Sequence, residues 1–145
     1  PLAIDVRDIT SHSLGIEATI PGTTQRILSI LIPRNTPLPV ERSKDYVTVN
    51  PNQTVIKVTV YQGETEELSA ARPVGDFVLL GLPPNRPPNQ KVRVTIRCDS
   101  NGIVNVTAVD IESGTTATTQ VSYLTGETPR EISAMQRYLA GTVIA

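Results

Sequence analysis

The segment that decides the fold is KVRVTIRCDSNGIVNVTAVD, residues 91–110. In its first eight residues, apolar side chains alternate with charged and hydroxyl side chains, which is typical of a strand with one buried face. Residues 99–102, Asp-Ser-Asn-Gly, are a strong signal for a hairpin turn. The alternation then resumes as far as Asp110. The segment therefore predicts two antiparallel strands joined by a tight turn.

Similar alternating stretches, separated by turn residues, recur along the rest of the chain. In residues 54–62, for example, Ile56, Val58 and Val60 share one face, and polar residues occupy most of the other. Further strands are expected over residues 14–20, 25–32, 45–49, 54–62, 75–80 and 115–123. About eight short strands with turns between them predict a mainly β protein, an antiparallel eight-stranded β-sandwich.

The composition agrees with a strand-rich protein whose core is aliphatic. The chain has 16 Val, 13 Ile and 18 Thr, so 47 of its 145 residues are β-branched, and aromatic residues make up 3%. A net charge of −1 gives no electrostatic indication of binding to nucleic acid or to an acidic membrane. The single cysteine excludes a disulfide within the chain. The apolar runs are too short to span a membrane, and we expect a cytoplasmic protein.

The periodicity changes near the C-terminus. Residues 128–131, Thr-Pro-Arg-Glu, combine an N-cap, a proline at the first helical position and a capping glutamate. Ile132, Met135 and Leu139 then recur at helical spacing. The sequence therefore predicts one short amphipathic helix after the sandwich. Because the chain starts at a proline and stops in an apolar tail, we expect it to be a fragment of a longer protein.

The residues that could carry out catalysis are few. Cys98 and His12 are the one nucleophile and base of the usual kind, but Cys98 lies on the apolar face of its strand and is expected to be buried. His12, between two serines, is expected at the surface, and one histidine without a second ligand does not make a metal site. We therefore expect a binding protein without catalytic residues, metal or cofactor.

Five segments carry more information than their patterns. They are SLGIE at 13–17, LIPRNTPLP at 31–39, NQT at 52–54, QGE at 62–64 and DSNGIVNVTA at 99–108. In this order and spacing they resemble the substrate-binding domain of the seventy-kilodalton heat-shock chaperones, the DnaK family. The resemblance covers residues 8–123 and continues into the start of the helix.

The resemblance implies a peptide-binding sandwich followed by a helical lid. Residues 1–8 would be the remnant of an interdomain linker, 9–124 the sandwich, and 125–145 the beginning of the lid. Such a domain holds short, extended, hydrophobic segments of unfolded proteins in a channel and performs no chemistry itself. ATP would bind to an N-terminal ATPase domain outside this chain, with a J-domain co-chaperone and a nucleotide-exchange factor as further partners.

The resemblance also assigns ten residues to the channel. The walls of its central hydrophobic pocket would be Ile16, Tyr46, Ile56 and Val58. The other positions would be Val47 and Thr48, whose backbone bonds the peptide, Val49 and Thr19 (or Ile20), which form an arch over it, and Gln53 and Val92, which line the channel further along.

Two departures from the family pattern leave alternatives open. Tyr46 stands where the family usually has phenylalanine, and the hairpin between Glu17 and Ile32 is longer than usual. A specialised homologue with one dedicated client is therefore an alternative to a general chaperone. An unrelated β-sandwich that binds another ligand is a second alternative, because the fold alone does not fix function. We also expect that a terminal segment can enter the channel of a neighbouring molecule.

Overall fold

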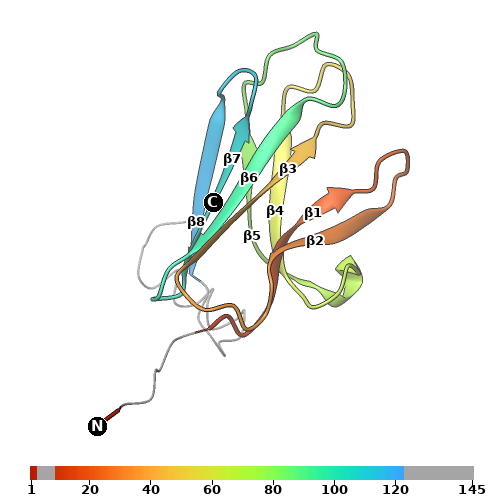
Figure 1. The fold of residues 1–145 in the computed structure, drawn as a ribbon. Helices are drawn as coiled ribbons and strands as arrows, with labels where there is room; N and C mark the ends of the chain where they lie inside the picture. The colour runs from red at the N-terminus through yellow and green to blue at the C-terminus, as the bar shows by residue number, and fades with distance from the viewer. Residues whose placement is uncertain (3–8, 123–145) are drawn as a thin grey trace, which may run out of the picture.

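The computed structural model describes residues 1–2 and 9–122, and these form two four-stranded antiparallel sheets packed face to face (Figure 1). The strand orders are β2-β1-β4-β5 and β3-β6-β7-β8. The strands are β1 (Leu14–Thr19), β2 (Arg26–Ile32), β3 (Val40–Val47), β4 (Ile56–Gln62), β5 (Arg72–Leu79), β6 (Lys91–Cys98), β7 (Ile103–Asp110) and β8 (Thr116–Ser122), and a short 3₁₀ turn, η1 (Leu68–Ala70), precedes β5. The predicted sandwich is confirmed. The predicted helix, and most of the predicted linker, lie outside the described residues.

Two strands begin earlier than their sequences predicted. β3 starts at Val40 instead of Asp45, and β5 starts at Arg72 instead of Gly75. Both are edge strands, where a proline costs no ladder hydrogen bond. Pro73 therefore fits inside β5, beside a shift in the pairing with β4. The nearby prolines led the sequence interpretation to place both starts too late.

The core forms where the alternating apolar residues of the two sheets meet. Val60, Ile96 and Cys98 have no exposed surface, and Val94 has almost none, as their alternation predicted. The hairpin turn at residues 99–102 is confirmed, with the Asp99 carboxylate accepting the backbone N–H groups of two later residues in the turn region. Burial of these aliphatic side chains is the main source of stability for such a sandwich.

Gly15 fixes how closely β1 and β2 approach. A Cβ atom at this position would lie 2.1 Å from the carbonyl oxygen of Ser29, so no other residue fits. The pairing shifts at the same place, between Leu14 and Gly15. Beyond the shift, Ile16 pairs with Ser29 and both side chains lie on the inner face of the sheet.

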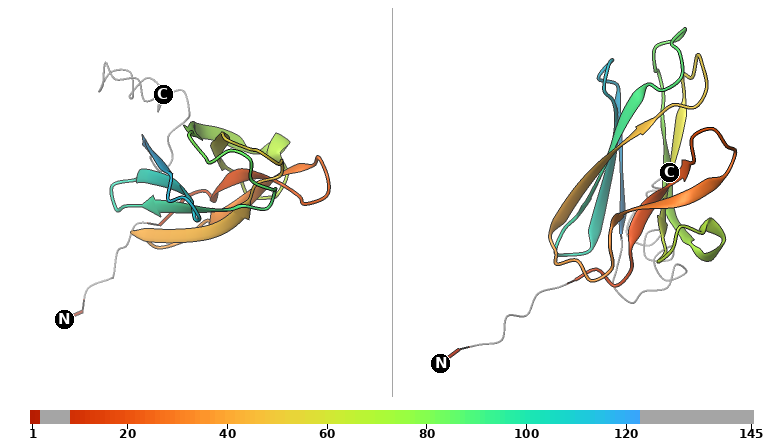
Figure 2. Two further views of the ribbon diagram at one scale, coloured as in Figure 1. Left: turned by 90° about the horizontal axis from the view of Figure 1, so that it is seen from above. Right: turned by 45° about the vertical axis from the view of Figure 1, so that its right-hand side comes forward.

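Four loops gather at one end of the sandwich. The antiparallel pairings place the ends of β1, β3, β5 and β7 beside the starts of β2, β4, β6 and β8. The loops at this end are residues 20–25, 48–55, 80–90 and 111–115. The second and third of them run side by side in each view (Figure 1, Figure 2). We call this end the loop end.

Candidate functional site

Loops 48–55 and 80–90 are bonded to each other at several points. The Asn52 backbone N–H donates to the Arg86 carbonyl (2.8 Å), and the Asn52 side chain accepts the Asn85 N–H (2.7 Å). Asn52 and Asn85 both adopt positive φ, a conformation that asparagine tolerates better than most residues. The two loops therefore form one structured unit, although residues 83–88 contain four prolines.

A buried ion pair joins this unit to the turn between β7 and β8. Arg86 Nη1 lies 2.9 Å from the carboxylate of Asp110, whose side chain is fully buried, while that of Arg86 is 11% exposed. Arg86 Nη1 also lies 3.6 Å from the exposed Glu112. Arg86 Nε and Nη2 have no hydrogen-bond partner among the described residues. Because neither charge can be hydrated freely, the pair is a strong constraint on where loop 80–90 lies.

β3 presents an open backbone edge at the loop end. It is the outer strand of its sheet, and Tyr46 pairs with Val92 of β6 on its inner side. The next residue beyond β3, Thr48, exchanges backbone bonds with Gln90 (3.0 Å) and Asn89 (2.8 Å). In an antiparallel ladder successive residues point their N–H and C=O groups to opposite sides. The backbone groups of Val47 therefore point away from β6, toward the open edge.

Exposed apolar side chains concentrate around this edge. Val47 is 42% exposed, and Val49, two residues further along the chain, is 54% exposed. Large apolar residues usually lie inside a domain, so an exposed group of them marks a surface that contacts another molecule. Open backbone groups and exposed aliphatic side chains lie together here.

The ten residues assigned to the channel fall into three groups. Ile16, Val58 and Val92 belong to the hydrophobic core cluster, and Tyr46 and Ile56 are partly buried against it. Val47, Thr48 and Val49 end β3 or follow it. Thr19 ends β1 opposite Arg26, and Gln53 bonds within its own loop, to Val55 and Asn50. The structure thus brings five of the ten into one apolar cluster.

The backbone of Thr48 is engaged within the chain. Its N–H and C=O bond to loop 80–90, and its hydroxyl accepts the Gln90 N–H (3.0 Å). Thr48 is accordingly buried, unlike its neighbours. Open backbone groups are therefore expected at Val47 and, by the same alternation, at Val49.

Two polar residues that the sequence interpretation did not single out contact Tyr46. The Tyr46 hydroxyl donates to Ser29 Oγ (2.8 Å), and Lys44 Nζ donates to the same oxygen (3.2 Å). We call these three side chains the Tyr46–Ser29 bridge; they connect β3 to β2, the edge strands of the two sheets. Burial raises the pKa of Tyr46, and the bond to Ser29 opposes part of that rise. A signal existed in the sequence, because Ser29 is the single polar residue of 27–32.

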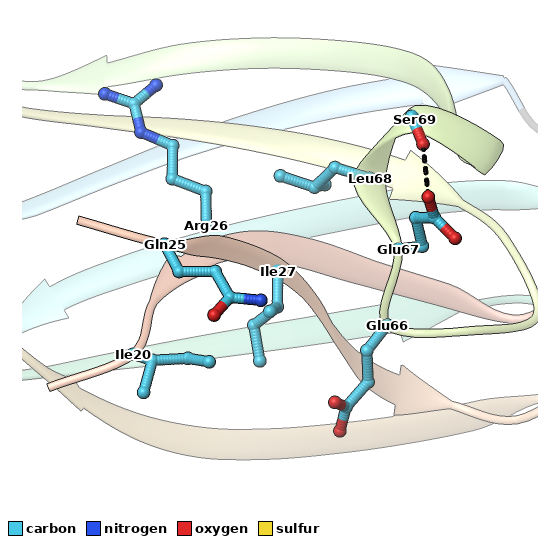
Figure 3. A pocket seen from close by; sticks show the side chains of 8 residues that line it. All are labelled: Ile20, Gln25, Arg26, Ile27, Glu66, Glu67, Leu68 and Ser69. Carbon is cyan, nitrogen blue, oxygen red and sulfur yellow. Dashed lines mark hydrogen bonds between the residues drawn. The ribbon is translucent and has the colours of Figure 1, made fainter. Parts of the chain in front are cut away.

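A separate hollow of about 510 Å³ lies beside β2 (Figure 3). Its walls come from the β1–β2 hairpin and from the segment around η1. They include the apolar side chains of Ile20, Ile27 and Leu68 and the carboxylates of Glu66 and Glu67. None of the residues assigned to the channel lines it, although Ile20 was the alternative to Thr19 for the arch.

Cys98 has the environment of a structural residue. It is fully buried, and burial, aided by the nearby charge of Asp99, raises the pKa of its thiol from 9.0 to about 11. The predicted burial of Cys98 is confirmed. His12 is half-buried and lies 3.8 Å from the carboxylate of Glu64. Among residues 1–2 and 9–122 no group of three or more side chains is arranged to hold a metal ion.

The native thiol of Cys98 should resist alkylation at neutral pH. Only the thiolate is a good nucleophile, and the raised pKa keeps Cys98 protonated. We expect a maleimide to label the folded chain at least about a hundredfold more slowly than the chain in denaturant. The raised pKa contributes stability that is complete below pH 9.0 and is lost as the pH rises toward about 11. Rapid labelling of the folded chain at pH 7 would contradict this assignment.

Comparison with known proteins identifies the family. A family model described as Hsp70 protein matches residues 3–140. The chain is 39% identical over 128 residues to a chaperone protein HscA homolog of Polynucleobacter asymbioticus, and 38% identical to one of Azotobacter vinelandii. It is 37% identical to the chaperone protein HscA of Salmonella heidelberg. Each match covers 88% of this chain and 20% of the relative.

The chain belongs to the Hsp70 family, as its five sequence segments predicted. These relatives carry the name HscA, so they support the family and not a DnaK-type member in particular. The chain spans about a fifth of their length. Within the described residues, no helix has the length and apolar character required to cross a membrane.

Proposed function

We propose that this chain is a peptide-binding domain of a chaperone, and that it holds short, extended, apolar segments of unfolded proteins at the loop end. The observation that carries the proposal is the open edge of β3 at Val47, flanked by the exposed side chains of Val47 and Val49. An extended peptide can add to such an edge through its backbone, without any particular sequence. The hydrophobic core cluster, with Tyr46 and Ile56 at its margin, would then accommodate one side chain of the bound peptide.

Simple energetics predict moderate affinity. Burying one valine or leucine side chain stabilises the complex by roughly 1.5–3 kcal/mol. Backbone pairing adds to this, but ordering a flexible peptide and losing its translational freedom oppose it. We expect a Kd in the micromolar range for this chain.

Titration of a fluorophore-labelled apolar heptapeptide tests the proposal. Saturable binding with a Kd of about 1–100 μM is expected, and an unlabelled copy should displace the labelled peptide. A matched peptide with aspartate in place of its central aliphatic residue should not bind. Absence of saturable binding to a folded chain at millimolar peptide would overturn the proposal.

A scan over many immobilised peptides distinguishes a general chaperone from a specialised one. Binding to many unrelated apolar segments supports the general function. Binding to a single motif supports the alternative of one dedicated client, for which the bond between Tyr46 and Ser29 is the relevant structural feature.

We further propose that the whole protein couples this domain to an ATPase domain outside the chain. A J-domain co-chaperone and a nucleotide-exchange factor would then act on that domain. The chain alone is expected not to hydrolyse ATP. ATP hydrolysis that co-purifies with the chain, and that a substitution in the chain abolishes, would contradict the proposal that the ATPase domain lies outside it.

A further inference from the structure

We propose that Ser29, through its hydrogen bond to Tyr46, limits the size of the apolar side chain that the site accepts, so that valine-sized residues are preferred over leucine and phenylalanine. This inference rests on the proposed function and refines its substrate class. In this proposal Ser29 is a specificity-determining residue, and Lys44 helps to hold the Ser29 side chain in place.

Ser29 and Tyr46 face each other from the two sheets, beside the apolar cluster. Ser29 pairs with Ile16 across β1 and β2, and its buried side chain lies on the same inner face as that of Ile16. Tyr46 pairs with Val92 on the inner face of the other sheet. The bond from the Tyr46 hydroxyl to Ser29 Oγ (2.8 Å) therefore crosses between the sheets beside the apolar cluster. A side chain that enters this cluster meets a fixed tyrosine ring.

The apolar cluster has little spare space for an incoming side chain. Ile16, Val58 and Val92 are only 3–4% exposed, so they leave little surface for an incoming side chain to cover. Five partly buried residues pack against the cluster, and Tyr46 and Ile56 are the two of them that are assigned to the channel. A large side chain can therefore be accommodated mainly by moving Tyr46. A short side chain can be accommodated with the Tyr46–Ser29 bridge intact.

Moving Tyr46 costs free energy, because its hydroxyl would leave Ser29. A buried hydroxyl that loses its partner carries a desolvation cost, and this cost falls on the larger ligands alone. Lys44 Nζ donates to the same Ser29 oxygen at 3.2 Å and lies 6.0 Å from the centre of the Tyr46 ring. Two donors on one oxygen fix the position of the Ser29 side chain, which makes the bridge a defined barrier instead of a mobile one.

Three heptapeptides that differ only at the central residue, Val, Leu or Phe, test this inference by fluorescence anisotropy. The wild-type chain is compared with Tyr46→Phe and Ser29→Ala, each of which removes the bond with little change in volume. Tyr61→Phe is the matched control, since Tyr61 is a half-buried tyrosine of β4 that lies outside the bridge. Circular dichroism checks that every variant is folded.

In the wild type, the Val peptide should bind most tightly and the Phe peptide least tightly. Tyr46→Phe and Ser29→Ala should each shift the ratio of Leu to Val affinity toward leucine by about five- to tenfold, the effect of one lost buried hydrogen bond. Tyr61→Phe should leave the ratio unchanged. If the two substitutions change the affinity for all three peptides by the same factor, the bond has a merely structural role and the inference is overturned. The same holds if they change none of the affinities. If the wild type binds none of the peptides, the proposed function itself fails.

Discussion

Replacing Ile56 by aspartate should abolish the binding of apolar peptides while leaving the domain folded. Ile56 is the first residue of β4 and is only partly buried, so a carboxylate there can be hydrated in the free protein. A bound peptide would remove that water and leave the charge without a partner, because Leu79, across the pairing, is apolar and fully buried. We expect affinity to fall at least about a hundredfold in the peptide titration.

Val78→Asp is the matched control for this variant. Val78 lies on β5 beside Lys57, is 45% exposed and faces away from the core. It tests the same chemical change near the same loops without affecting the proposed pocket. Val58 would be a poor substitute for Ile56, because it is buried in the core and an aspartate there should unfold the domain. Normal peptide affinity in a folded Ile56→Asp chain would contradict the pocket assignment.

Removing the carboxylate of Asp110 should produce the largest loss of stability available at the loop end. Asp110→Ala leaves the guanidinium of Arg86 buried, with Nε and Nη2 already without partners in the described part of the chain. Breaking a buried pair from one side costs about 3–5 kcal/mol. Urea denaturation followed by circular dichroism should show this loss in the free energy of unfolding. Asp110→Asn, which keeps the shape and removes the charge, isolates the electrostatic part.

An exposed ion pair of nearly the same length provides the comparison. Arg93 Nε lies 2.8 Å from the carboxylate of Asp45, but the two side chains are 52% and 41% exposed. The hydrogen bond from Arg93 lowers the pKa of Asp45, yet water can replace the bond when the pair is broken. Arg93→Ala should therefore destabilise the domain far less than Asp110→Ala, and 1 M salt should reduce its effect further. Equal losses from the two variants would show that burial does not anchor Arg86.

Local sequence patterns predicted most of the framework. The alternation in residues 91–110 predicted β6, the turn and β7, and the faces of β4 were assigned correctly from Ile56, Val58 and Val60. These predictions succeed because the side chains of a strand alternate with a period of two, whatever the strand packs against. The start of β5 could not be predicted in this way, because Pro73 fits inside the strand only where that strand lies at an edge, and strand order is not local information.

The candidate site divides in the same manner. Its apolar members could be predicted, since Ile16, Ile56 and Val58 carry both the alternation and the family resemblance. The polar connections could not, because Ser29 and Tyr46, or Arg86 and Asp110, are far apart in the sequence and no local pattern joins them. Likewise, the hydrogen bonds between the Thr48 backbone and loop 80–90 could not be predicted, because they depend on how two loops pack against each other.

The sequence by itself determined that this chain is a β-sandwich of the Hsp70 family with an aliphatic core, since the strand period, the turn residues and the five segments that resemble the family are all features of the local sequence. The tertiary structure alone decided which strands lie at the edges, which backbone groups of β3 remain open, and that the Tyr46 hydroxyl bonds to Ser29. The physical reason is that edge position, burial and hydrogen-bond partners depend on which distant segments come together when the two sheets pack.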